Sequence, residues 1–150
     1  MKRIFIYYSL NGSGDVVADC LKEQKVDIRK VEPQKRLPKS IIGQIFAGGF
    51  LATINHKSKL VDFNSDISKY DEIIIGSPIW NARFSTPINT VLDELDLHDK
   101  KVTFILYSAS GTSPKATEKI NKLYPNATII DLKEPKDNEQ ELNKVYLQKE

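Results

Sequence analysis

The chain has a single cysteine among its 150 residues, and it has no long hydrophobic run. Because Cys20 has no second cysteine to pair with, an internal disulfide is excluded, and we expect this thiol to be buried filler. No stretch approaches the roughly 20 apolar residues of a membrane-spanning helix. The first apolar run is far shorter than the core of a signal peptide, so we expect a cytoplasmic protein.

Net charge is also low, because 22 basic residues stand against 20 acidic ones. The basic residues are scattered rather than gathered in a stripe, so we expect no nucleic-acid partner. Histidines are scarce as well, and both His56 and His98 stand in polar surroundings. We therefore predict no catalytic residues and no metal site. The length fits one domain over residues 1–150.

Short apolar segments alternate with segments of helical spacing along the whole chain. Helix-like patterns begin after residue 14, at Thr86-Pro87 and at Ser113-Pro114, and we expect further helices at 41–54 and 138–148. Strands are expected at 4–8, 26–31, 70–77, 102–107 and 127–132, the second of them at a sheet edge. This alternation predicts an α/β fold, with one doubly wound parallel sheet and helices on both of its faces.

Three polar loops follow the predicted buried strands, where ligands of such sheets bind. The first loop offers backbone N–H groups at a helix start, which suits an anion such as a phosphate. The second carries Trp80, a platform for a flat aromatic ring, and the third is small and polar. The loops contain Ser9, Leu10, Asn11, Gly12, Ser13 and Gly14; Ser77, Pro78, Ile79, Trp80 and Asn81; and Ser108, Ala109, Ser110 and Gly111.

Segments 8–12, 70–80 and 101–111 together resemble short-chain members of the flavodoxin-like family of FMN proteins. The middle segment, followed by Pro87 and Leu92, is the most specific, and Phe46 to Phe50 resembles a stretch of one bacterial branch. The resemblance implies a five-stranded sheet of order 2-1-3-4-5 and noncovalent FMN. It also implies that the first loop holds the phosphate and that the other two contact the flavin ring.

The family usually has threonine in place of Asn11 and Asn-Thr in place of Ser13 and Gly14, and two departures bear directly on phosphate binding. Gly14 lacks the hydroxyl group that the family usually places there, and Asp15 brings a carboxylate near the phosphate position. A missing hydrogen bond to a charged group costs roughly 1.5–3 kcal/mol, so we expect weaker FMN binding than in typical carriers.

The sequence leaves three functions open. The first is electron transfer through FMN with a redox partner protein or a small-molecule donor or acceptor. The second is an FMN-dependent NAD(P)H or quinone oxidoreductase, in which Arg83 and Phe84 would meet a small substrate. The third is a flavin-free interaction module of the same fold. The oligomeric state, monomer or homodimer, stays open as well.

Overall fold

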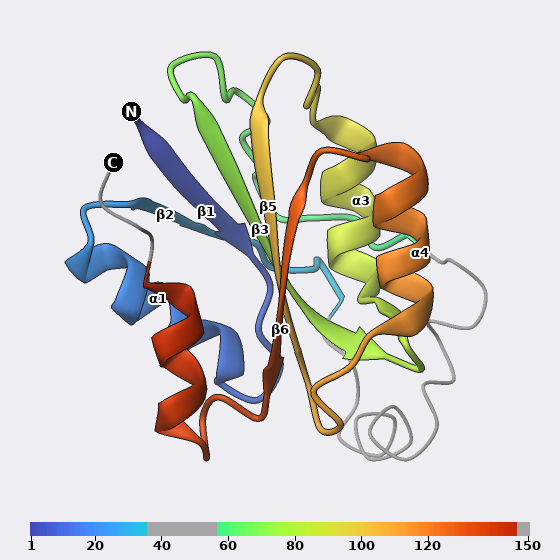
Figure 1. The fold of residues 1–150 in the computed structure, drawn as a ribbon. Helices are drawn as coiled ribbons and strands as arrows, with labels where there is room; N and C mark the ends of the chain where they lie inside the picture. Colours follow the sequence, from blue (N-terminus) through green and yellow to red (C-terminus); the bar gives the residue numbers. More distant parts are fainter. Residues whose placement is uncertain (36–56, 147–150) are drawn as a thin grey trace.

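The computed structural model describes residues 1–35 and 57–146 of the chain. Within these ranges, strands and helices follow one another along the chain as predicted (Figure 1). The elements are β1 (Arg3–Tyr7), α1 (Ser13–Glu23), β2 (Asp27–Lys30), β3 (Glu72–Trp80), β4 (Arg83–Phe84), α3 (Thr86–Glu94), β5 (Lys101–Ser108), α4 (Pro114–Leu123), β6 (Thr128–Lys133) and the 3₁₀-helix η2 (Glu139–Val145).

The sheet has the order β2-β1-β3-β5-β6, and its neighbouring strands all run parallel. The two-residue strand β4 lies off this path and pairs antiparallel with β3. Counted without β4, the parallel strands stand in the order 2-1-3-4-5, which confirms the predicted topology. Strand β2 lies at an edge of the sheet, also as predicted.

Alternate residues of β1 pack on opposite faces of the sheet, as the pleat of a strand dictates. Phe5 and Tyr7 join the apolar cluster that contains Val17 and Leu21 of α1 and Val145 of η2. The other cluster contains Ile4, Ile6 and Tyr8, together with apolar residues of α3 and α4. Helices therefore cover both faces, with α1 and η2 on one side and α3 and α4 on the other (Figure 1).

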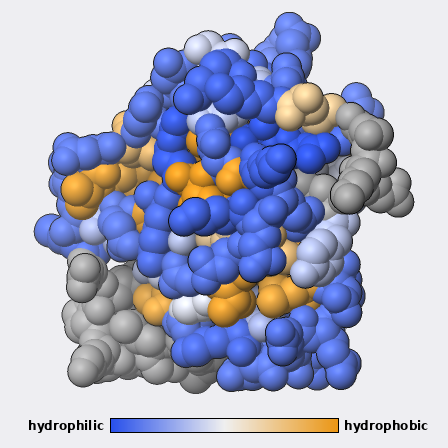
Figure 2. Space-filling model, turned by 90° about the vertical axis from the view of Figure 1, so that its left-hand side faces the viewer, coloured by the Kyte–Doolittle hydropathy of each residue, from blue (hydrophilic) through white to orange (hydrophobic). Residues whose placement is uncertain are grey.

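The outer surface of the molecule on the side of α1 and η2 is largely hydrophilic, with smaller apolar patches (Figure 2). In the described part of the chain, the structure contains no helix with the length and apolar character that crossing a membrane requires. Cys20 is buried in the α1 cluster, as expected, and burial raises the pKa of its thiol.

The C-terminal segment differs from the α-helix expected over 138–148. It forms η2, whose residues 139–145 make a 3₁₀-helix, while 147–150 lie outside the described residues. Leu142 and Val145 are three positions apart, so they fall on one side of a helix with three residues per turn. The helix expected at 41–54, including Phe46 to Phe50, and His56 also lie outside the described residues.

Candidate functional site

The three polar loops begin at the same edge of the sheet. Strands β1, β3 and β5 are parallel neighbours, and Tyr7 pairs with Gly76 while Pro78 pairs with Tyr107. Tyr8 N–H donates to the Gly76 carbonyl at 3.2 Å, and the buried Tyr107 hydroxyl donates to the Tyr8 carbonyl. The fold thus brings the starts of all three predicted loops together at the carboxyl ends of the central strands.

The first loop gathers backbone N–H groups around side-chain oxygens. The N–H groups of Gly12 and Gly14 both donate to Ser9 Oγ, at 3.2 and 3.1 Å. Ser13 N–H donates to Asn11 Oδ1 at 3.1 Å. Helix α1 starts directly at Ser13, so the helix dipole adds partial positive charge at this point. These donors suit an anion with several oxygen acceptors, such as a phosphate group.

A lysine from the opposite end of the chain lies over this loop. Lys136 follows β6, and its Nζ donates to the Asn11 carbonyl at 2.9 Å. Its Cδ lies 3.5 Å from the position that a Cβ on Gly12 would occupy. Sequence reasoning missed Lys136, because the contact spans 125 positions and no motif surrounds the residue. It places a cation where the sequence alone offered only neutral donors.

The structure shows what surrounds Gly14 and Asp15, the two departures from the family pattern that bear on phosphate binding. A Cβ on Gly14 would lie 2.5 Å from the Tyr107 hydroxyl oxygen and 2.8 Å from Tyr7 Cδ2, so a side chain there would require these neighbours to shift. Asp15 Oδ1 accepts a hydrogen bond from the Tyr7 hydroxyl at 2.8 Å and lies 3.0 Å from Lys30 Nζ. Burial, and then the bond to Asp15, raises the pKa of Tyr7. Lys30 therefore balances much of the Asp15 charge.

The second predicted loop is mostly strand, because residues 77–80 belong to β3 and only Asn81 lies in the turn that follows it. Ser77 is fully buried, and its Oγ donates to the Pro78 carbonyl at 2.7 Å and accepts from Ser85 N–H at 3.1 Å. The bond from Ser85 N–H ties the inner part of β3 to Ser85, the N-cap of α3. Pro78 is buried and Ile79 half-buried, whereas Asn81 is exposed. The Ser77 hydroxyl thus faces the protein interior.

Trp80 belongs to the apolar core beside α3 and α4. Its side chain is only 2% exposed and meets Tyr8 edge to face, with ring centroids 6.0 Å apart. Its Nε1 is buried and has no hydrogen-bond partner among the described residues. A buried donor left unpaired costs roughly 1–3 kcal/mol, so this position of the indole is not an optimal one. For a flat ligand to stack on it, the indole must be uncovered.

Asn81 and Ala82 form the two-residue turn between β3 and β4. Trp80 pairs with Arg83 across it, and φ is 50° at Asn81 and 63° at Ala82. Two consecutive positive φ values are what a type I′ hairpin requires, and Asn-Gly is the sequence that suits it best. Alanine at the second position is therefore strained, since left-handed backbone costs a residue with a Cβ roughly 1–2 kcal/mol.

Ala82→Gly is accordingly expected to raise the free energy of unfolding by about 0.5–1 kcal/mol. Relief of strain at Ala82 outweighs the roughly 0.5–1 kcal/mol that glycine adds to unfolded-state entropy. Urea denaturation measures the change. Ala127→Gly is the matched control, because Ala127 does not have a positive φ and the same substitution should lower stability there. Equal losses in both variants would contradict the assignment of strain to Ala82.

The third loop is held by its own hydroxyl groups. Gly111 N–H donates to Ser108 Oγ at 2.9 Å, and Ser108 Oγ donates to the Thr112 carbonyl at 3.2 Å. Ser110 Oγ lies 3.0 Å from Thr112 Oγ1. Ala109 and Ser110 are exposed, so they are the residues of this loop that a ligand reaches first.

The strand order and the loops at one sheet edge define a class of α/β proteins, those with flavodoxin-like topology. A family profile of flavodoxins matches residues 51–148, and the chain belongs to the flavodoxin family. No protein with a curated functional description matches the sequence.

Solved structures share the fold over nearly the whole chain. A flavoprotein from Lactobacillus acidophilus, solved in complex with FMN, is 20% identical over 93% of this chain and 97% of its own, with a TM-score of 0.70. A protein from Bacteroides eggerthii is 18% identical over 98% of this chain and 99% of its own, with a TM-score of 0.69. One from Bacteroides uniformis is 18% identical over 95% and 97%, with a TM-score of 0.71.

Proposed function

We propose that this chain binds FMN noncovalently and transfers electrons through it. The observation that carries the proposal is the convergence of Gly12 and Gly14 N–H groups on one oxygen, with the Lys136 cation beside them. Further support comes from membership in the flavodoxin family and from the FMN complex of the Lactobacillus acidophilus protein, which has the same fold. When bound, FMN supplies a flavin that accepts and releases one or two electrons.

In this proposal the phosphate is held by the loop before α1. Ser9, Asn11 and the N–H groups of residues 12–14 supply hydrogen bonds, and Lys136 supplies charge. The Ser9 hydroxyl accepts two of those N–H bonds, so an incoming phosphate oxygen must take them over. Lys136 offsets part of the loss of FMN affinity that we expect from Gly14 and Asp15, because a charge-assisted bond is stronger than a neutral one.

The flavin ring would contact the last residues of β3, the turn after that strand and the loop after β5. Residues 77–81 and Ser108 to Gly111 stay the predicted ring contacts, and stacking requires the Trp80 indole to leave its place beside Tyr8. The unpaired Nε1 lowers the cost of that movement. Because Trp80 is the sole tryptophan of the chain, its fluorescence reports this step without interference.

Titration of the protein with FMN tests the proposal directly. We expect saturable quenching of both flavin and Trp80 fluorescence, and a Trp80→Phe variant that binds FMN with less flavin quenching. Riboflavin, which lacks the phosphate, should bind more weakly by at least about tenfold. An absence of FMN binding at high protein concentration would refute the proposal and favour the flavin-free module.

A second measurement separates electron transfer from substrate turnover. The FMN-loaded protein, photoreduced with EDTA as the electron donor, is mixed with cytochrome c as a one-electron acceptor, and we expect rapid reoxidation of the flavin. Steady-state oxidation of NADH or NADPH with a quinone is followed in parallel. Efficient turnover there, with slow reduction of cytochrome c, would overturn the carrier assignment in favour of an oxidoreductase.

Lys136→Met is expected to weaken FMN binding by about tenfold, because it removes the positive charge over the phosphate loop. Riboflavin affinity should stay unchanged, since riboflavin has no phosphate group. Fluorescence titrations with both ligands measure the two dissociation constants. Lys22→Met, which removes an exposed lysine from the last turn of α1, is the matched control. Equal weakening of both ligands by Lys136→Met would assign Lys136 a structural role instead.

A further inference from the structure

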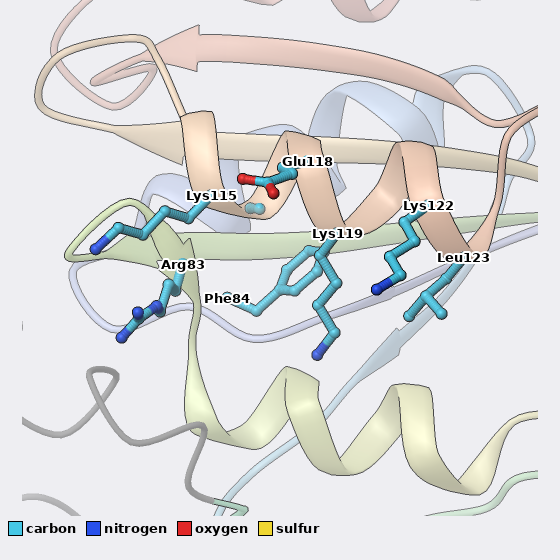
Figure 3. A pocket seen from close by; sticks show the side chains of 8 residues that line it. Arg83, Phe84, Lys115, Glu118, Lys119, Lys122 and Leu123 are labelled. Atoms are coloured by element: carbon cyan, nitrogen blue, oxygen red, sulfur yellow. The ribbon is translucent and has the colours of Figure 1, made fainter.

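A second concave site lies between α4 and β4, apart from the phosphate loop. It is a cavity of about 390 Å³, and the side chains of Arg83, Lys115, Glu118, Lys119 and Lys122 line it. Figure 3 shows Arg83 and Lys115 at one end of this basic pocket, Lys122 at the other, and Lys119 between them. Four of its side chains are therefore cationic, and only one is anionic.

The charge of the three pocket lysines is not paired with a carboxylate of the described residues. In residues 1–35 and 57–146, none of Lys115, Lys119 and Lys122 forms such an ion pair. Burial, and then repulsion by the Lys57 charge, lowers the pKa of Lys119. Lys57 itself pairs with Asp93 at 2.9 Å, so that carboxylate is already engaged.

The floor of the basic pocket is apolar. Phe84 is 2% exposed, and Lys119 Nζ lies 5.7 Å from the centre of its ring. Ala116 is buried on the inner side of α4, whereas Leu123, the last residue of α4, is 54% exposed at the rim of the pocket. Several cations around a hollow with an apolar floor concentrate positive potential, because a low-dielectric wall focuses the field.

We propose that the basic pocket binds a small polyanion that carries phosphate or carboxylate groups. Its volume falls in the range of small-molecule sites, roughly 300–1,000 Å³. A concave site of this size favours a compact ligand over the flat acidic surface of a partner protein. Lys115, Lys119 and Lys122 contact its anionic groups, and Leu123 contacts an apolar part of the ligand.

The basic pocket lies next to the candidate flavin site but does not depend on it. Arg83 pairs with Trp80 across the β3–β4 hairpin, so a ligand in the pocket is one strand away from the predicted ring contacts. The groups that recognise the anion come from α4 and β4, and none of them belongs to the phosphate loop. Anion binding at the pocket is therefore expected whether or not the protein carries FMN.

Titrations with inorganic pyrophosphate and with ADP, followed by backbone NMR at low salt, test the proposal. We expect saturable shifts in residues 115–123 and at Arg83, unchanged when FMN is added. Shifts in residues 9–14 report binding at the phosphate loop separately. Pyrophosphate tests the charge alone, and ADP tests whether an attached organic group adds affinity.

A pair of double variants supplies the matched comparison. Lys115→Gln with Lys122→Gln should weaken pyrophosphate binding at α4 by about tenfold. Lys22→Gln with Lys35→Gln removes the same charge from exposed positions elsewhere and should change it little. Equal weakening in both pairs would mean that net charge, not the pocket, attracts the anion. Shifts at α4 with a poly-aspartate peptide, but with neither small anion, would overturn the proposal in favour of an acidic protein partner.

Discussion

Gly76→Ala is expected to lower the free energy of unfolding by about 3 kcal/mol, as overpacking of a tight core does. Gly76 lies in the middle of the sheet, paired with Tyr7 of β1. A Cβ there would meet the end of the Phe5 ring, with Phe5 Cε2 at 2.5 Å, and Tyr7 Cβ at 2.8 Å. The rings of Phe5 and Tyr7 stack on one face of β1, with their centroids 4.8 Å apart and their planes nearly parallel, and both lie in the core. Phe5 and Tyr7 are at most 4% exposed, so neither side chain can move aside without disturbing its packed neighbours.

The Phe5→Leu background provides the test of this mechanism. Leucine at position 5 removes the far end of the ring that the new Cβ would strike, so Gly76→Ala should cost at least about 1 kcal/mol less there. Urea denaturation of the four proteins of this cycle measures the coupling. A loss below about 0.5 kcal/mol in the wild-type background would contradict the proposed clash, and so would an equal loss in both backgrounds.

Gly76 also illustrates which features of the fold could be predicted from the sequence. The apolar run of β3 predicts a strand buried on both faces, because only a central parallel strand excludes polar residues along its length. The sequence does not indicate that a glycine within that run makes room for the stacked rings of Phe5 and Tyr7. That requirement comes from the register between β1 and β3, which only the folded sheet defines.

The candidate site also combines features that the sequence predicts with features that only the folded chain creates. Backbone N–H groups at the start of α1 follow from a local pattern of strand, glycine turn and helix, so the sequence predicts them. The burial of Trp80 depends on the hairpin that β4 makes with β3, and its two left-handed residues, Asn81 and Ala82, are not a common hairpin sequence. Lys136 reaches the loop across 125 positions, a contact that only the tertiary fold creates.

At the C-terminal segment, tertiary packing also overrides the local preference for an α-helix. The spacing of its apolar residues favoured an α-helix over 138–148, yet residues 139–145 form a 3₁₀-helix. Val145 is buried against the α1 cluster, and Gln24 Nε2 donates to its carbonyl at 3.3 Å. Contacts with α1 therefore decide the position of this segment, and helical propensity alone cannot supply them.

Gly12→Val is expected to weaken FMN binding by at least about a hundredfold, the largest effect on binding that we predict. Gly12 caps α1 with φ at 95°, a conformation that a β-branched residue avoids. Valine would either strain the loop or turn its peptide N–H groups away from their common acceptor. Its Cβ would lie 3.5 Å from Lys136 Cδ, an ordinary van der Waals distance, so the expected loss comes from the backbone. Phosphate binding then loses its N–H donors.

Riboflavin and protein stability are the two controls for Gly12→Val. The strain should cost about 1–2 kcal/mol of unfolding free energy, which leaves a typical domain folded. Riboflavin does not use the loop, so its affinity should change little, whereas FMN should bind the variant no more tightly than riboflavin does. If FMN retains its affinity in a folded Gly12→Val protein, the phosphate is held elsewhere. The N–H groups before α1 would then only close a helix cap.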